Sequence, residues 1–266
     1  MYFVAVEIVR FIGFNRPRLV ILYYHSLPPA KRAAFARQLD AVQSGCDAVV
    51  PADFSGPAVP GQLFVAITFD DAFTSVVENA LPELAARGMP STLFAPPGLL
   101  AQSPSWEMEE EHAQDRRETV ASRDTLRAVA GDLVAIGAHS VTHPRLPRVD
   151  REAAVAEIFG SKEQLERMLE REVTLFAFPF GEYNDELLGL CRGARYRHAF
   201  TIVPRVIDPT TDSFVRGRVP VSLDDGALEF WLKMRGGYSW MPRLSRLRSW
   251  LSPNANNLRI PSQNTL

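Results

Sequence analysis

The feature of this sequence that most constrains its fold is the alternation of short apolar runs with longer amphipathic stretches. The runs at residues 18–25 and 63–69 are rich in β-branched and aromatic side chains, which is typical of strands buried on both faces. Between them, residues 30–44 carry apolar side chains at the spacing of a helix. The same criteria predict further strands at residues 91–95, 133–138, 176–178, 198–203 and 214–221, and further helices at 74–87, 124–130, 150–169 and 183–191. This order predicts an α/β fold with a parallel sheet, either open or closed into a (β/α) barrel.

Length, charge and cysteine content narrow the kinds of protein that this chain can be. Its 266 residues, 46% of them hydrophobic and 23% charged, are enough for one large α/β domain. The formal net charge of −2 provides no global attraction for polyanions, so we expect no nucleic-acid partner. Cys46 and Cys191 form no CxxC pattern, so a bound metal would have to be held by histidine and carboxylate side chains.

Both ends of the chain differ in composition from the part between them. Residues 1–17 form an apolar segment, residues 18–251 the predicted domain, and residues 252–266 a flexible tail rich in Ser, Asn and Pro. Residues 1–14 include one acidic and one basic residue and lack a clear cleavage site, so they do not resemble a signal peptide, and they are too short to span a bilayer. We expect them to form a helix packed on the domain, or a peripheral contact with a membrane surface. The expected location is the cytoplasm, with membrane association as the alternative.

Side chains that can ligate a metal or transfer a proton follow several of the predicted strands. They are His25 after the first strand, Asp70 and Asp71 after the second, His139 and His143 after residues 133–138, and the turn Pro179-Phe180-Gly181 after residues 176–178. In both parallel architectures ligands bind at the carboxyl ends of the strands, so we expect these residues to meet on one face.

The pattern of these residues predicts a metal site. Two adjacent carboxylates beyond an apolar strand are costly unless a cation or hydrogen bonds compensate them, although an Asp pair can also cap a helix, here one starting near Thr74. Two histidines with three residues between them can reach one ion, and an acidic ligand would complete a three-residue site with open positions for water. Zinc or a similar transition metal fits this donor set.

Three motifs resemble those of the polysaccharide deacetylase family, which is also known as the NodB homology domain or carbohydrate esterase family 4. The sequence Thr-Phe-Asp-Asp at 68–71 is similar to the TFDD motif, residues 139–143 to the H-S/T-x-x-H motif, and FAFPFG at 176–181 to the third motif. They occur in the order of the family, within a resemblance that covers roughly residues 18–222. The resemblance implies a distorted (β/α) barrel of the NodB-homology type. It also implies a metal-dependent hydrolase that removes N-acetyl, or alternatively O-acetyl, groups from a polysaccharide or its sugar precursor.

The resemblance also implies a role for each site residue. Asp71, His139 and His143 would hold a divalent metal, with zinc preferred and cobalt or nickel as alternatives, while Asp70 would act as the catalytic base. The backbone N–H of Phe180, flanked by Pro179 and Gly181, would stabilise the oxyanion. The expected partner is an acetylated glycan or a sugar-lipid precursor.

The chain departs from the family pattern at the catalytic acid. No histidine follows His198, so the late leucine-histidine motif that supplies the acid is absent. One subgroup of the family carries its acid histidine near the start of the domain, in a strand that ends in Tyr-His or Phe-His, and Tyr24-His25 is similar. We therefore predict His25 as the acid; the alternative is a histidine that only bonds a loop. His198 is expected to be structural.

Two further departures concern the surroundings of the base. The arginine of the third motif is replaced by Ala177, and the glycine common after TFDD is Ala72. Arg218 could supply the missing charge, but we expect it to be a surface residue. Residues 96–122 are predicted to form an exposed insertion, in which Trp106 would either stack on a sugar ring or pack in the core.

Two other functions remain compatible with the sequence. The same residues could serve a deformylase or another amidohydrolase that acts on a small or lipid-linked sugar. Alternatively, the missing late histidine would allow a catalytically inactive, carbohydrate-binding relative of the deacetylases.

Overall fold

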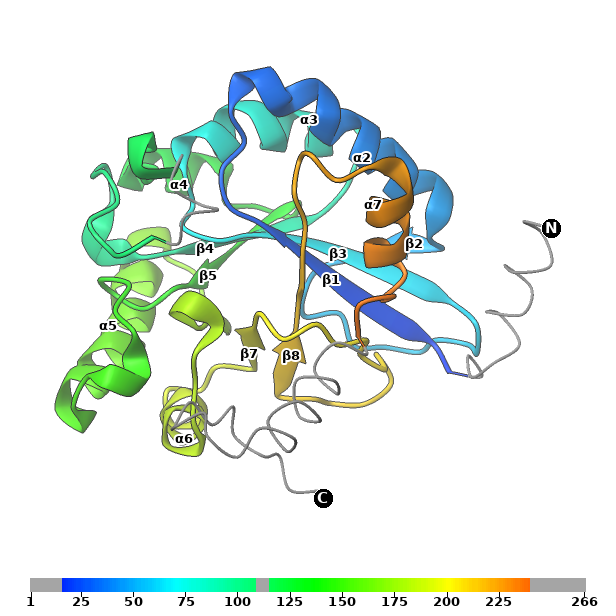
Figure 1. Cartoon of the computed structure of the whole chain (residues 1–266). Coiled ribbons are helices and arrows are strands. Elements are labelled where there is room, and N and C mark those ends of the chain that lie inside the picture. Colours follow the sequence, from blue (N-terminus) through cyan, green and yellow to red (C-terminus); the bar gives the residue numbers. More distant parts are fainter. Residues whose placement is uncertain (1–15, 109–114, 240–266) are drawn as a thin grey trace, which may run out of the picture.

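Parallel strands form the centre of the molecule, and helices surround them (Figure 1). The computed structural model describes residues 16–108 and 115–239. Within them the strands are β1 (Arg18–Tyr24), β2 (Ala48–Val49), β3 (Leu63–Phe69), β4 (Ser91–Ala95), β5 (Val134–Ala138), β6 (Leu175–Ala177), β7 (His198–Thr201), β8 (Val215–Gly217) and β9 (Val219–Pro220). The α-helices are α2 (Arg32–Gly45), α3 (Leu81–Ala86), α4 (Arg123–Val129), α5 (Arg151–Leu169), α6 (Asp185–Gly193) and α7 (Ala227–Met234).

The sheet is nearly closed into a barrel. Its strand order is β8-β7-β6-β5-β4-β3-β1-β9, with β2 also paired to β3, and every strand pair is parallel. The strands at the two ends of this order, β8 and β9, are separated in the chain only by Arg218. The two ends of the sheet therefore meet at that residue, which confirms the distorted (β/α) barrel. The single strand predicted at residues 214–221 is instead two short strands that pair with opposite ends of the sheet.

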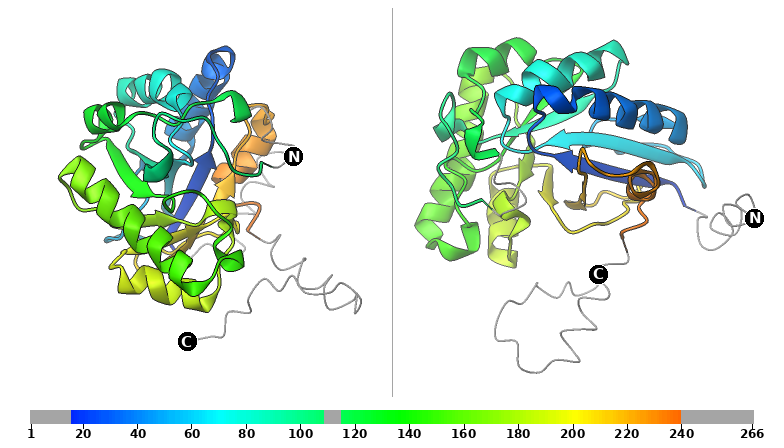
Figure 2. Two further views of the ribbon diagram at one scale, coloured as in Figure 1. Left: turned by 90° about the vertical axis from the view of Figure 1, so that its left-hand side faces the viewer. Right: turned by 45° about the horizontal axis from the view of Figure 1, so that its top comes forward.

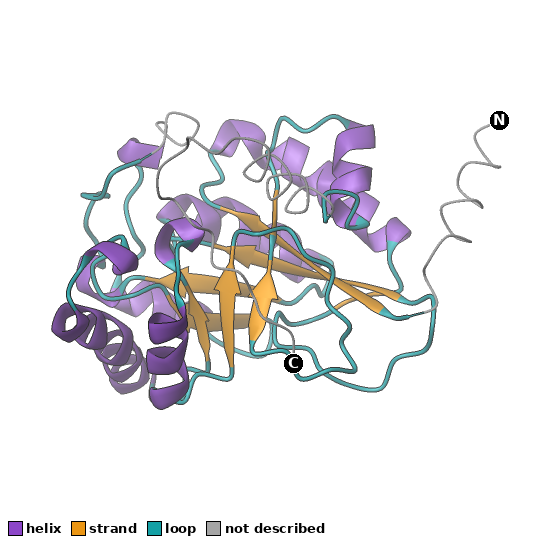
Figure 3. Ribbon diagram, turned by 60° about the horizontal axis from the view of Figure 1, so that its bottom comes forward, coloured by secondary structure: helices purple, strands orange, loops and turns teal. Residues whose placement is uncertain are grey.

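Side-chain alternation along the strands separates two apolar layers. In β1, Leu19 and Ile21 belong to a buried cluster that includes Phe94 and Phe200 and contains no helix residue, which places it inside the barrel. The alternate residues of β1 belong to the larger cluster that packs the sheet against its helices. Figures 2 and 3 show these helices on the outer side of the strands. Burial on both faces explains why the strand sequences are almost wholly apolar.

Local signals in the sequence set the helix boundaries. Ser122, Asp150 and Asn184 cap α4, α5 and α6, because each side chain accepts a hydrogen bond from the backbone N–H three residues later. The helix predicted at residues 74–87 is divided into a π-helical turn, Val76–Ala80, and α3. Pro82 lies at the junction, where it has no N–H to donate to the preceding turn.

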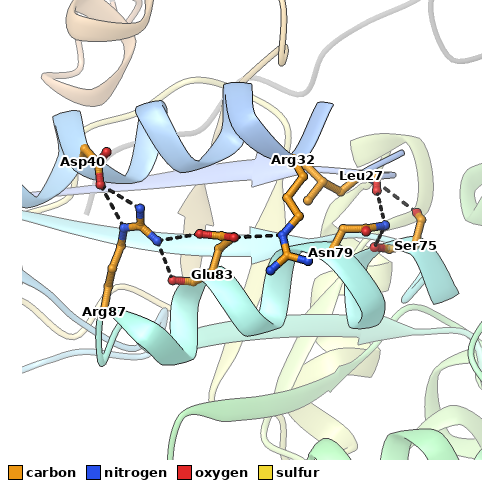
Figure 4. Close-up of polar contacts among 7 residues, drawn as sticks. All are labelled: Leu27, Arg32, Asp40, Ser75, Asn79, Glu83 and Arg87. Atoms are coloured by element: carbon orange, nitrogen blue, oxygen red, sulfur yellow. Dashed lines mark hydrogen bonds and ion pairs between the residues drawn. The ribbon is translucent and has the colours of Figure 1, made fainter. Parts of the chain in front are cut away.

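The chain that follows β1 is fastened to the helix layer (Figure 4). Leu27 donates its N–H to Ser75 Oγ at 3.1 Å, and its carbonyl accepts from Asn79 Nδ2 at 2.9 Å. Figure 4 also shows Arg87 between Asp40 and Glu83, an ion-pair group nearer the surface. The buried contacts at Leu27 fix the loop that begins at the end of β1.

Three predictions about the less regular parts have different outcomes. Residues 96–122 are not simply an exposed insertion, since Leu99, Val120 and Ala121 are buried. Residues 1–15 and the predicted tail at 252–266 lie outside the described residues, so the proposed domain limits stay predictions. Among the described helices, none is long and apolar enough to cross a membrane.

Candidate active site

Asp71, His139 and His143 come together beyond the carboxyl ends of β3 and β5. The Nε2 atoms of His143 and His139 lie 3.3 Å and 3.7 Å from Oδ1 of Asp71. One potential ligand atom from each residue lies within 4.8 Å of the others, and all three side chains are buried. The structure thus gathers the three residues that the sequence predicted as metal ligands.

The geometry of this cluster fits a divalent transition metal. Two ligand atoms about 2.1 Å from a tetrahedral ion lie about 3.4 Å from each other, which is close to the separations of Asp71 Oδ1 from the two imidazole nitrogens. Among the described residues, this buried Oδ1 has no hydrogen-bond partner. His139 donates Nδ1–H to the carbonyl of Ala177 at 2.8 Å, so its neutral ring leaves Nε2 free of a proton on the side of Asp71.

The two imidazoles of the cluster are in the protonation state that a cation requires. Burial lowers the pKa of His139, and burial together with the neighbouring imidazole lowers that of His143 well below its usual value. Both rings are therefore neutral and able to ligate. Burial, then the charges of Asp70 and Asp115, raise the pKa of Asp71 well above its usual range. A bound cation would offset this increase and keep the carboxylate ionised.

Asp70 forms an ion pair with Arg218, the residue between β8 and β9 at which the two ends of the sheet meet. The guanidinium donates Nη1–H to Oδ1 of Asp70 at 2.6 Å and Nη2–H to Oδ2 at 2.8 Å. Arg218 is 0% exposed, so the prediction of a surface arginine is wrong. The charge that is missing at Ala177 therefore comes from the junction of β8 and β9.

This ion pair keeps Asp70 charged despite its burial. Burial by itself would raise the pKa of the carboxyl, but the charge and hydrogen bonds of Arg218 outweigh burial and hold that pKa below its usual range. The guanidinium also lies against the rings of Tyr23 and Phe94, at 4.8 Å and 5.2 Å from their centroids. A planar group confined between rings and a carboxylate has little freedom to turn, so Asp70 is fixed in orientation.

His25 lies just past the end of β1 and lines the same pocket as the metal cluster and Asp70. It is half-buried, and the ring of Tyr23 meets it edge-on at 5.7 Å between centroids. The next residue, Ser26, donates its hydroxyl to Asp115 at 2.5 Å. Asp115 is 2% exposed and lines the pocket, yet sequence reasoning missed it because it is one acidic residue among many in that stretch.

The turn at residues 179–181 forms another wall of the pocket. Phe180 adopts a left-handed backbone conformation with φ of 58°, and its side chain lines the pocket. Gly181 also has a positive φ, of 64°, and a Cβ there would lie 2.3 Å from the side chain of Ile202. Only glycine fits that position, which explains the last residue of the Pro-Phe-Gly sequence.

Aromatic and charged side chains pack against His143 and Phe180, two residues that line the pocket. His143 lies between Trp106, whose ring stacks on it at 4.4 Å between centroids, and Phe180, which meets it edge-on at 4.8 Å. Arg145 lies 3.9 Å from the centroid of the Phe180 ring and donates to Glu182 at 2.6 Å. Trp106 therefore lines the pocket beside His143 and also packs against the hydrophobic core, where its ring stacks on that of Phe73 at 6.3 Å between centroids.

Comparison with known sequences decides the family of this chain. The family model for polysaccharide deacetylase matches residues 59–199, which is more than half of the chain. The chain belongs to the polysaccharide deacetylase family. The matched range contains Asp70, Asp71, both histidines of the cluster and the turn at 179–181, but neither His25 nor Arg218.

A curated relative of this polysaccharide deacetylase family member has low sequence identity to it. YxkH of Bacillus subtilis, assigned as a polysaccharide deacetylase, is 25% identical over 163 residues, which are 61% of this chain and 53% of that protein. The chain thus spans about half the length of this curated relative.

Two solved structures share the barrel. The Streptococcus pyogenes deacetylase PplD, in complex with acetate, has a TM-score of 0.67 at 19% identity and covers 82% of this chain and 99% of its own. IcaB from Ammonifex degensii has a TM-score of 0.65 at 24% identity, covering 84% and 97%. At these identities the likeness establishes the fold.

Proposed function

We propose that this family member is a metal-dependent deacetylase that hydrolyses N-acetyl groups, or alternatively O-acetyl groups, of a polysaccharide or its sugar-lipid precursor. The observation that supports this most strongly is the placement of Asp71, His139 and His143 beside Asp70 in one pocket. Two imidazoles and one carboxylate suit zinc best, with cobalt and nickel as alternatives. When bound there, the ion would act as a Lewis acid that makes water and an acetyl carbonyl more reactive.

In this proposal Asp70 removes a proton from the attacking water. Both of its oxygens accept a hydrogen bond from Arg218, and each keeps a further lone pair that can receive the proton. Because Arg218 fixes the plane of the carboxylate, the accepting lone pair needs no reorientation during the reaction. The ion pair also ensures that Asp70 is ionised when the substrate arrives.

Phe180 and His25 would act on the two groups that are attached to the acetyl carbon and change during the reaction, the carbonyl oxygen and the departing amine. The backbone N–H of Phe180 would donate to the developing oxyanion, an interaction whose loss typically costs about 3 to 4 kcal/mol. His25, in the same pocket, would protonate the departing amine. The products would be acetate and a free amino sugar, and acetate is the ligand in the PplD structure.

The proposal is tested by measuring acetate release from purified full chain loaded with Zn²⁺, Co²⁺ or Ni²⁺. The substrates would be a panel of N-acetylated and O-acetylated glycans and sugar-lipid precursors. We expect acetate release that requires the metal and is lost in Asp70→Asn. Metal-loaded protein that releases formate from N-formyl sugars but no acetate would replace the proposal with a deformylase. Binding of glycans without any hydrolysis would replace it with an inactive carbohydrate-binding protein.

A further inference from the structure

The loop that carries both histidines of the cluster has an unfavourable backbone. Ser140 and His143 have φ of 56° and 60°, in the left-handed region that residues with a Cβ rarely adopt. These two turns allow the imidazoles of His139 and His143, four positions apart in the chain, to face the same carboxylate. Within the loop, Ser140 Oγ accepts from the N–H of His143 at 3.0 Å. This single hydrogen bond does not fix the two residues in between, Val141 and Thr142, which must be positioned by contacts from other parts of the fold.

A single carboxylate from the neighbouring helix holds them. Glu157 lies in the second turn of α5, and its Oε2 accepts the N–H groups of Val141 at 2.7 Å and Thr142 at 2.8 Å. Its Oε1 accepts the hydroxyl of Thr142 at 2.6 Å. Hydrogen bonds to an ionised acceptor are stronger than those between neutral groups. Three donors of two consecutive residues therefore converge on one side chain.

The helix end that carries this carboxylate is itself anchored. Asp150 caps α5, and Ala154 and Ile158 bury the adjacent positions of its inner face. On the other side, Gly98 donates its N–H to the carbonyl of Val141 at 2.9 Å, and a Cβ on Gly98 would come within 2.8 Å of that residue. The peptide groups of the loop are thus fixed from two directions.

We propose that Glu157 is a positioning residue for the metal centre. It fixes the backbone between His139 and His143 so that both imidazoles face Asp71 before any ion binds. This inference rests on the proposed function in that it assumes these three residues hold a divalent metal. Glu157 would touch neither metal nor substrate; it would act through the two histidines.

The reach of the Glu157 side chain makes a graded prediction possible. Glu157→Gln keeps an oxygen that can accept both N–H groups, whereas Glu157→Asp is too short to reach them and Glu157→Ala has no acceptor. We expect the dissociation constant for Zn²⁺ to rise about 10- to 100-fold in the Ala and Asp variants, as when partners of metal ligands are lost. The Gln variant should stay within about 5-fold of the original chain, because it retains the acceptor that orients the loop.

Glu163→Ala is the matched control, because Glu163 lies on the same helix and, within the part of the chain that the structure describes, its ion pair is an exposed one with Arg167. Zn²⁺ and Co²⁺ affinities of the full chain would be measured by competition with a coloured chelator, and thermal unfolding with and without metal would be recorded in parallel. A lower Tm of the metal-free Ala variant with an unchanged metal affinity would overturn the inference and leave Glu157 as a structural contact. Equal losses in the Ala and Gln variants would overturn it as well. If the original chain binds neither ion, the proposed function itself fails, which is a separate outcome.

Discussion

Two buried arginines, two residues apart, serve opposite ends of the barrel. Arg216 and Arg218 are both 0% exposed. Arg216 donates to the carbonyls of Ala52 and Phe54 at 2.7 Å and 3.0 Å, in the connection between β2 and β3, whereas Arg218 forms a bidentate ion pair with Asp70. One arginine thus meets neutral oxygens and the other a carboxylate.

The difference teaches how the same residue can have a structural role or a functional one. Burial lowers the pKa of Arg216 to about 10, because its partners are uncharged oxygens that only satisfy its hydrogen bonds. At the other end, Arg218 compensates a carboxylate that would otherwise tend to become neutral. In the proposed mechanism, the arginine beside the carboxylate supports catalysis, and the arginine beside the carbonyls closes the barrel.

The largest effect should come from removing the carboxylate partner of Arg218. We expect Asp70→Asn to reduce kcat by about 10²- to 10⁴-fold, since a general base typically contributes this much. The variant should also lose about 3 to 5 kcal/mol of unfolding free energy, because it leaves a buried guanidinium without its counter-charge. Turnover and urea unfolding check the two effects separately, and full activity in this variant would contradict the assignment of the base.

Two histidines also lie at opposite ends of the barrel: His25 lines the pocket, and His198 begins β7 at the amino-terminal end. His25→Ala should lower kcat about 10²-fold, as expected for a general acid, while the unfolding free energy falls by about 1 kcal/mol or less, because the half-buried ring packs against Tyr23. The check is steady-state kinetics with an N-acetylated substrate and with one that has a better leaving group, which needs the acid less. An equal loss with both substrates, or no loss, would argue against His25 as the acid.

Exchanging each arginine for methionine compares the two ends directly. Arg218→Met should reduce kcat about 10- to 100-fold, because the base loses its orientation and its counter-charge. Arg216→Met should leave kcat unchanged and cost about 1 to 3 kcal/mol of unfolding free energy through unpaired carbonyls. If both variants lose the same fraction of kcat and have the same unfolding free energy, the distinction between a functional Arg218 and a structural Arg216 is contradicted.

The smallest effect concerns the dependence of stability on pH at the amino-terminal end of the barrel. Burial, then the charge of Arg216, lowers the pKa of His198 to about 4, and its Nδ1–H donates to the carbonyl of Ser213. Between about pH 6.5 and pH 4 the unfolded chain binds a proton that the folded chain does not, so stability falls as the pH falls. This residue should account for about 2 kcal/mol of the loss between pH 7 and pH 5. His198→Gln should reduce that loss in urea unfolding; an identical loss in both proteins would refute the assignment.

The sequence predicted what depends on local pattern. Apolar runs ending in reactive side chains located the strands, and motif spacing located Asp71, His139 and His143. Periodicity left an open sheet and a barrel equally possible, because closure depends on how β8 and β9 pair with strands distant in the chain.

The parts that the sequence could not predict depend on contacts across the fold. In residues 214–221 both arginines alternate with apolar residues, a pattern that separates two faces without telling which one points inward. Arg218 was therefore expected at the surface, although its partner Asp70 lies 148 residues away in the chain. Glu157 is likewise an ordinary helix residue until the fold brings α5 against the loop after β5. Burial of polar side chains at a closed interior has no local signature.

Metal stoichiometry in three proteins tests the central claim most directly. The claim is that Asp71, with His139 and His143, holds a divalent ion while Asp70 is left free as the base. Zn²⁺ titration of the original chain, Asp70→Asn and Asp71→Asn should give one equivalent bound in the first two and weak or no binding in the third. One tightly bound equivalent in Asp71→Asn, or its loss in Asp70→Asn alone, would contradict this division of roles between the two adjacent carboxylates.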